Sequence, residues 1–205
     1  MATGTKWPLA IGAGGILLLM ATGVKAATMV KRKVTIKDVT QAKALVQKWI
    51  KVFPRVELGW AMAIIGNESR FNPDAKNLTS PGDVARGGAW GYMQMTLKTA
   101  QGVAGQLQVL NNAAVFPVLR TWDKTGPGLL NPNLNIMMGV GYLDQLAKSL
   151  GDNARANPRL VVAAYNRGLG GVKAMLAKGL PMDGLAYVQN VEAMRNQLLE
   201  SGVFA

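Results

Sequence analysis

The sequence of 205 residues contains no cysteine and no histidine, and only 11 of its residues are acidic. Without cysteine the chain forms no disulfides and offers no thiolate ligands for a metal. Without histidine as well, Ser-His-Asp and Cys-His catalysis are excluded and zinc chemistry is disfavoured. We therefore expect neither a metal nor a cofactor, and acid–base catalysis must use carboxylates, lysines or tyrosines.

Positive charge is concentrated near the N-terminus. Residues 1–55 contain ten Lys and Arg against the single acid Asp38, a net charge of +9, whereas residues 56–205 contain thirteen against ten acids, a net charge of +3. A basic segment of this kind favours anionic partners such as lipid headgroups, nucleic acid or the cell-wall polymer. The alternative interpretation is a basic surface that is simply solvated.

A run of eighteen uncharged residues, 7–24, lies between Lys6 and Lys25. A membrane-spanning helix needs about 20 mainly apolar residues. The run is typical either of a secretory signal cleaved after residue 26 or of a retained anchor with Trp7 at one membrane interface. We favour the anchor and predict a transmembrane or signal segment over 1–26, followed by a basic tether over 27–37.

The remaining residues, 38–205, predict one mainly helical domain. Apolar residues recur at every third or fourth position over several stretches, and the expected helices are 38–53, 56–69, a helix after Thr96, 135–150, 158–168, 171–178 and 184–200. Residues 71–90 and 111–133 are rich in proline, glycine and asparagine, which predicts long loops. The first loop has room for a short hairpin, and no internal repeat is present.

One glutamate stands at the end of a very apolar stretch. In a helix over 56–69, Leu58, Ala61, Met62 and Ile65 form one stripe, and Glu68 falls at its edge. A carboxylate that faces a protein core is costly unless it has a use. The position therefore indicates a functional carboxylate, and the simpler alternative is a helix-terminal glutamate that points to solvent.

Three short motifs lie at the expected helix ends, E-S-R-F-N-P from Glu68, G-Y-M-Q from Gly91 and A-Y-N-R-G from Ala164. In this order and spacing they resemble the lysozyme-like lytic transglycosylases, the superfamily of the soluble lytic transglycosylases and goose-type lysozymes. The segments N-I-M-M-G-V-G-Y-L from Asn135 and A-Y-V from Ala186 are similar to further family segments. The resemblance covers most of the predicted helical domain.

The resemblance implies cleavage of the β-1,4 bond between N-acetylmuramic acid and N-acetylglucosamine in peptidoglycan, with a 1,6-anhydro-muramyl end as the product. By position, Glu68 is the general acid of this reaction and then takes the proton of the muramyl 6-hydroxyl. Apolar surroundings would raise its pKa and keep it protonated near neutral pH.

The family pattern also implies residues that hold the substrate. Gln94 and the backbone of Met93 are expected to bind sugar hydroxyls, and Ser69 to contact the sugar near the acid. Tyr165 is expected to hydrogen-bond and orient Glu68, and Asn166 to bind an N-acetyl group. The simpler alternatives are a Ser69 hydroxyl bonded to its own helix and a Tyr165 that is part of the core.

Two other functions stay open at this level. Glycosidases commonly use a second carboxylate, and Asp74 or Asp83 on the 71–90 loop would make the chain a hydrolytic muramidase. Alternatively, the chain is a non-catalytic, membrane-anchored structural protein of a virion that binds glycan or DNA. We interpret Trp49, Trp60 and Trp122 as core residues.

The expected partners follow from the two predicted parts of the chain, the helical domain and the N-terminal segment. The domain takes peptidoglycan as substrate, and residues 7–24 contact a lipid membrane. The setting is a bacterial cell envelope or a virion whose membrane or capsid proteins are partners and whose genome must pass the wall. The basic N-terminus, with its affinity for nucleic acid or anionic lipid, favours the virion.

Overall fold

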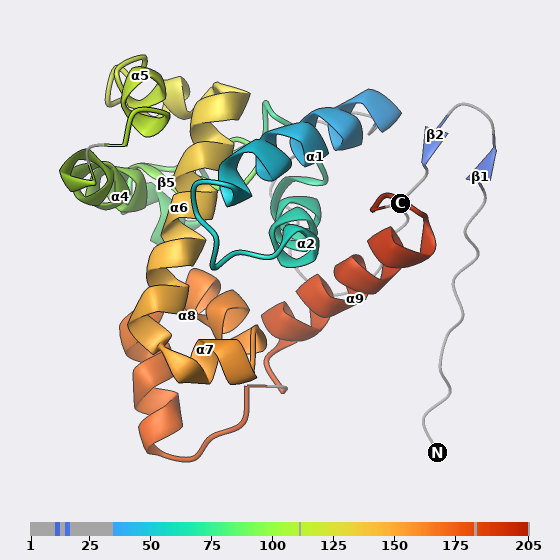
Figure 1. The fold of residues 1–205 in the computed structure, drawn as a ribbon, viewed down its shortest axis with the longest axis vertical. Coiled ribbons are helices and arrows are strands. Elements are labelled where there is room, and N and C mark those ends of the chain that lie inside the picture. The colour runs from blue at the N-terminus through green and yellow to red at the C-terminus, as the bar shows by residue number, and fades with distance from the viewer. Residues whose placement is uncertain (1–10, 13–14, 17–34, 111, 183, 205) are drawn as a thin grey trace.

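The computed structural model describes residues 11–12, 15–16, 35–110, 112–182 and 184–204. Figure 1 shows a largely helical molecule. The helices are α1 (Ile36–Ile50), α2 (Leu58–Ser69), α3 (Pro81–Val84), α4 (Leu97–Val109), α5 (Val115–Leu119), the 3-10 helix η1 (Pro127–Leu130), α6 (Pro132–Leu150), α7 (Asp152–Ala156), α8 (Arg159–Ala177) and α9 (Ala186–Glu200). The strands are β1 (Ile11–Gly12), β2 (Gly15–Ile16), β3 (Lys76–Asn77), β4 (Ala89–Trp90) and β5 (Met95–Thr96).

Helix α6 is the central element of the fold. It is apolar along most of its length, and α1, α4, α5 and α8 all pack on it. Figure 1 shows α6 with α4 and α5 on one side and α1 and α2 on the other. Asn131 caps its first turn, and Gly151, at φ 58°, ends it. A glycine is favoured there because this backbone conformation is strained for residues with a Cβ.

Helix α2 lies between α1 and α9, and most of its residues are buried. Gly66 permits this arrangement, because a Cβ at that position would lie 2.7 Å from the sulfur of Met194 on α9. The two helices run in opposite directions, since the start of α9 lies beside the end of α2 and Arg195 near the end of α9 contacts Gly59. Close approach of α9 thus helps to bury the central turns of α2, from Ala61 to Gly66.

The predicted helices are present, but their bounds and number differ, and the short helix α7 was not predicted. Helix α1 begins at Ile36 because Thr35 and Asp38 form a capping box, so the predicted tether over 27–37 ends earlier. The helices expected over 158–168 and 171–178 are one element, α8, with a kink at Gly168. The loop predicted over 111–133 contains α5 and η1.

The loop predicted over 71–90 contains α3 and part of a small sheet. Strands β3, β4 and β5 pair antiparallel in that order, with Lys76 opposite Trp90 and Trp90 opposite Met95. The hairpin that the sequence allowed is therefore larger, because Met95–Thr96 adds a third strand. The turn between β4 and β5 carries the G-Y-M-Q motif.

Buried Asn135 on α6 fixes this turn to the core. Its Nδ2 donates to the carbonyls of Trp90 at 2.8 Å and Leu129 at 2.9 Å, and its Oδ1 accepts from the Met93 N–H at 2.8 Å. Gly91 adopts φ 72° and donates to the Ala75 carbonyl at 2.7 Å. Because every polar atom of the Asn135 amide group is used, the turn has one defined position.

The predicted membrane segment over 7–24 lies outside the described residues, except for β1 and β2. These two strands pair antiparallel, with Ile11 opposite Ile16 and Gly12 opposite Gly15. Within the part of the chain that the structure describes, no helix has the length and apolar character needed to cross a bilayer.

Candidate active site

Glu68 lies in the last turn of α2, directly before the chain changes direction. Arg70 and Phe71 both adopt left-handed backbone conformations, with φ 53° and 58°, and end the helix. Met62, Ile64 and Ile65 of the same helix are fully buried. Buried apolar residues therefore cover more of the helix than the single stripe that the sequence predicted, and Ile64 and Ile65 lie one turn before Glu68.

Burial raises the pKa of the Glu68 carboxyl to about 7 from its ordinary value of 4.5. The largest cause is desolvation, which disfavours the charged form. The hydroxyl of Tyr187 donates to Glu68 Oε1 at 2.5 Å and acts in the opposite direction, while the negative charge of Asp83 raises the pKa further. The group can hold or release a proton near neutral pH, as a general acid must.

A small polar cavity lies beside this carboxyl. Its volume is about 120 Å³. Helix ends, the sheet and α3 all contribute to its lining, which consists of Glu68, Asp83, Arg86, Gln94, Met95, Thr96, Thr99, Tyr142, Tyr165 and Asn166. The three motifs from distant parts of the sequence therefore meet at one cavity.

The tyrosine that donates a hydrogen bond to Glu68 is Tyr187, and not Tyr165 as the sequence predicted, although Tyr165 lines the same cavity. The Tyr165 hydroxyl donates to the Met93 carbonyl at 2.6 Å, and its ring packs against Tyr142 with the centroids 5.6 Å apart. Desolvation raises the pKa of both Tyr165 and Tyr187 well above the ordinary value, so both hydroxyls stay protonated donors. The A-Y-V segment was the sequence signal for Tyr187.

Met93 and Gln94 have different surroundings. The Met93 side chain is fully buried and does not line the cavity, and its N–H and carbonyl bond to Asn135 and Tyr165. Gln94 lines the cavity in a left-handed conformation, and its Nε2 donates to the carbonyls of Ala75 and Gly91. Both amide protons of Gln94 are therefore used, and its Oε1 is the atom available to accept from a sugar hydroxyl.

Ser69 and Asn166 differ in their position relative to the cavity. Ser69 is buried, and its hydroxyl donates to the Ile65 carbonyl of its own helix at 3.0 Å. This is the simpler of the two sequence interpretations, and Ser69 is absent from the cavity lining. Asn166 is exposed and borders the cavity, where an amide group can reach a substrate.

Of the two candidate second carboxylates, only Asp83 borders the cavity, and Asp74 lies exposed elsewhere on the loop. Asp83 accepts from Arg86 Nη2 at 2.9 Å on one oxygen and from Asn77 Nδ2 at 2.9 Å on the other. The remaining lining residues were not predicted. Of these, only Tyr142 lies in a segment that resembles the family, N-I-M-M-G-V-G-Y-L.

The family comparison agrees with this geometry. The family described as the Transglycosylase SLT domain matches residues 45–179. The chain belongs to this family.

Over 138 residues the chain is 30% identical to the soluble lytic murein transglycosylase of Salmonella typhimurium. The aligned residues are 66% of this chain and 18% of that protein. The chain is similar to the solved structure of an inactive glutamate-to-glutamine mutant of the lytic transglycosylase Slt from Pseudomonas aeruginosa, with a TM-score of 0.57, 25% identity and coverage of 78% of this chain and 24% of that chain.

These matches confirm the predicted family and the mainly helical, lysozyme-like fold class. The chain spans less than a quarter of the length of either relative.

The raised pKa of Glu68 predicts a pH-dependent difference in stability between the native chain and Glu68→Gln. In the native chain the unfolded state ionises Glu68 near its ordinary pKa of 4.5, while the folded state keeps the proton up to about 7. The free energy of unfolding therefore falls between these pH values, by about 3 kcal/mol. Urea unfolding should show that Glu68→Gln gains this amount relative to the native chain between pH 4 and pH 8.

The matched control for this measurement is Glu200→Gln, which changes an exposed carboxylate at the end of α9. Glu200→Gln should not gain stability relative to the native chain between pH 4 and pH 8. A Glu68→Gln difference that is the same at pH 4 and pH 8 would contradict the proposed desolvation.

Proposed function

We propose that this SLT domain is a peptidoglycan lytic transglycosylase that cleaves the β-1,4 bond between N-acetylmuramic acid and N-acetylglucosamine. The observation that carries the proposal is a carboxyl group, Glu68, with a pKa of about 7 beside a polar cavity. The names of both relatives support it, and the inactive form of the Pseudomonas protein differs by one glutamate-to-glutamine change.

In the first step the Glu68 carboxyl gives its proton to the glycosidic oxygen, and the bond from that oxygen to muramyl C1 breaks. Positive charge develops on the sugar ring, and the neighbouring N-acetyl group of the substrate stabilises it. Glu68 is left as a carboxylate. The hydroxyl of Tyr187, which donates to Oε1, stabilises this charged form.

In the second step the Glu68 carboxylate takes the proton of the muramyl 6-hydroxyl, and the oxygen forms a bond to C1. The product is a 1,6-anhydro ring, water is not consumed, and Glu68 is protonated again. One group with a pKa near the working pH can serve in both steps, because its two protonation states have similar free energies.

Hydrolysis with Asp83 as the base is the second candidate, because Asp83 borders the cavity. We favour the anhydro product, since both Asp83 oxygens already accept hydrogen bonds from Arg86 and Asn77. A carboxylate held in this way is a poorer base for water. Asp74 lies outside the cavity lining, so we do not assign it a role in catalysis.

Glu68→Gln should reduce the release of muropeptides from peptidoglycan by about 10²–10⁴-fold, the usual contribution of a general acid. Mass spectrometry of the products separates the candidates, because anhydro ends indicate the lyase and reducing ends the hydrolase. Asp74→Asn is the control and should keep the native rate. Full activity of Glu68→Gln would rule out the assignment of the acid.

Tyr187→Phe should move the falling limb of the pH profile of kcat/KM to higher pH. The hydroxyl stabilises the Glu68 carboxylate and lowers its pKa, so its loss raises the pKa above about 7 and keeps the acid protonated to higher pH. Tyr142→Phe changes a cavity tyrosine that makes no hydrogen bond to Glu68, and it should leave the limb in place. An unchanged limb in Tyr187→Phe would show that the contact is not used.

We also propose that residues 7–24 attach the domain to a membrane, either in a bacterial envelope or in a virion that delivers its genome through the wall. The support is the uncharged run between Lys6 and Lys25 and the basic residues that follow. The full chain should stay with membranes during alkaline carbonate extraction, whereas Leu18→Arg should release it. Extraction of the native chain would refute the anchor, and absence of the chain from purified virus particles would refute the viral setting.

A further inference from the structure

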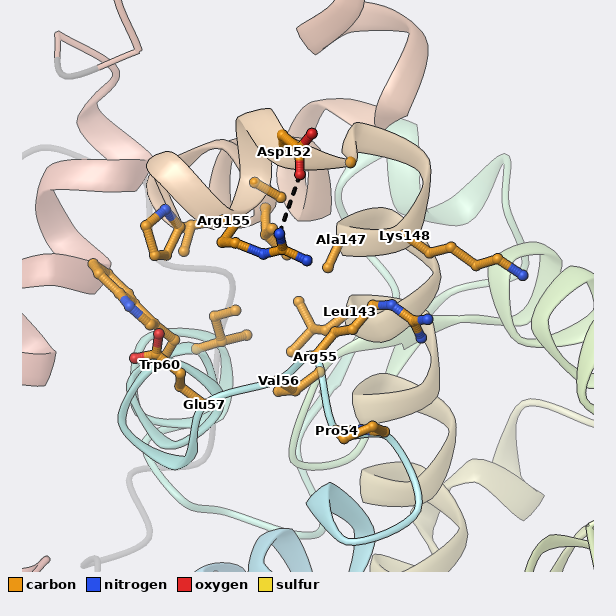
Figure 2. A pocket seen from close by; sticks show the side chains of 16 residues that line it. Pro54, Arg55, Val56, Glu57, Trp60, Leu143, Ala147, Lys148, Asp152 and Arg155 are labelled. Atoms are coloured by element: carbon orange, nitrogen blue, oxygen red, sulfur yellow. Dashed lines mark hydrogen bonds and ion pairs between the residues drawn. The ribbon is translucent and has the colours of Figure 1, made fainter.

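A second cavity, of about 560 Å³, lies at the opposite end of α2 from Glu68. Figure 2 shows it between the start of α2, the later turns of α6, and α7. Glu57 at this end and Glu68 are eleven positions apart, which corresponds to about 16 Å along the helix axis. The cavity is larger than the one beside Glu68 and has no part in the reaction proposed above.

The floor of this second cavity is apolar and its rim is charged. The buried floor residues are Val56, Ile64, Leu143, Ala147, Ala154 and Val162. The charged rim residues are Arg55, Glu57, Lys148, Asp152 and Arg155. A volume in the range of about 300–1,000 Å³, with an apolar floor and a few polar groups, is typical of sites for small ligands or for part of a polymer.

Glu57 is available to a ligand. It is the residue before the first turn of α2, but its side chain makes no capping hydrogen bond. Among the residues that the structure describes, it has neither a hydrogen bond nor an ion pair. A chain with only 11 acids thus places an unengaged carboxylate at the rim of its larger cavity.

Figure 2 shows the Arg155 side chain, which extends from α7 among the residues that line the cavity. Its partner is Asp152 at 3.3 Å, and both side chains are almost fully exposed, at 87% and 95%. An ion pair in water holds its members weakly. Arg155 can therefore exchange this contact for a ligand, whereas Arg55 is held by the less exposed Asp144 at 3.0 Å.

Trp60 supplies a flat apolar surface beside these groups. It is partly exposed and borders the cavity, which corrects the expectation that all three tryptophans considered are core residues. Trp49 and Trp122 are buried as expected. The guanidinium of Arg195 on α9 lies over the Trp60 ring, 4.9 Å from its centroid, and this contact holds the indole in position.

This combination matches a sugar better than an anion. A sugar ring has an apolar C–H face that can stack on an indole, and its edge carries hydroxyls that pair with carboxylates and guanidinium groups. The free carboxylate of Glu57 disfavours phosphates and nucleic acid, while the two acids and three bases of the rim leave little net charge.

We propose that this cavity is a second glycan-binding site, which holds an N-acetylated sugar stretch of the same wall polymer on which Glu68 acts. The choice of that polymer rests on the proposed function. Trp60 stacks on a sugar ring, Glu57 accepts hydrogen bonds from sugar hydroxyls, and Arg155 donates to hydroxyl or acetyl oxygens. Binding at both ends of α2 keeps the enzyme on an insoluble polymer, because the second contact forms at high effective concentration.

The test uses the full chain with Glu68→Gln, which binds without turnover, and the trimer of N-acetylglucosamine as the probe. Titration followed by NMR separates the two cavities, since the Trp60 indole N–H reports the second site and the Gln94 side-chain amide reports the first. The Trp60 signal is assigned by Trp60→Phe. We expect a saturable shift of the Trp60 signal.

Adding Glu57→Gln and Arg155→Gln should weaken binding at Trp60 at least tenfold. Both side chains are exposed, so the fold should tolerate the changes. The matched control is Lys173→Gln with Glu200→Gln, which removes one base and one acid from exposed positions outside the cavity. It should bind as the parent does.

Three results would overturn the proposal: a Trp60 signal that does not move with the trimer, equal affinity in the Glu57/Arg155 variant and its parent, or a shift caused by free wall peptide and not by the trimer. None of these depends on turnover. A failure of the proposed function would appear separately, as native protein that releases no muropeptides from peptidoglycan.

Discussion

Desolvation of the Glu68 carboxyl raises its pKa to about 7, and the packing of α2 produces this desolvation. Helix α9 must approach α2 closely to exclude water, and Gly66 makes room for Met194 at the contact. The same helix places Tyr187 against Glu68 Oε1. Core packing and acid–base chemistry are therefore one feature of this molecule, because the helix that desolvates the acid also donates a hydrogen bond to it.

The sequence contains no histidine, and the side chains that hold the G-Y-M-Q turn in place are a tyrosine and an asparagine. Tyr165 and Asn135 bind the carbonyl and the N–H of Met93, and this fixes the G-Y-M-Q turn. Gln94 follows directly and has both amide protons engaged. These neutral groups keep the same charge across the pH range in which Glu68 titrates, so the shape of the cavity does not depend on their protonation.

Helix α2 also connects the two cavities. Glu68 stands at its last turn beside a small polar cavity, and Glu57 and Trp60 stand at its start beside a larger one. The central turns are fully buried against α1 and α9. A rigid helix of this kind holds the two cavities at a constant separation.

The sequence alone predicted the long helices, since their period depends only on local spacing, but not the short helices α3, α5, η1 and α7. It also indicated the family and singled out Glu68 as the candidate acid, because a motif keeps its order along the chain. It left two interpretations of Ser69 open, a contact with the sugar and a hydroxyl bonded to its own helix. Only the tertiary structure decided that Tyr187, and not Tyr165, contacts Glu68, that Asp83 and not Asp74 borders the cavity, and that Trp60 is accessible. These facts depend on how α9, α3 and α7 pack against α2 and its surroundings, and such long-range contacts leave no periodic signal in the sequence.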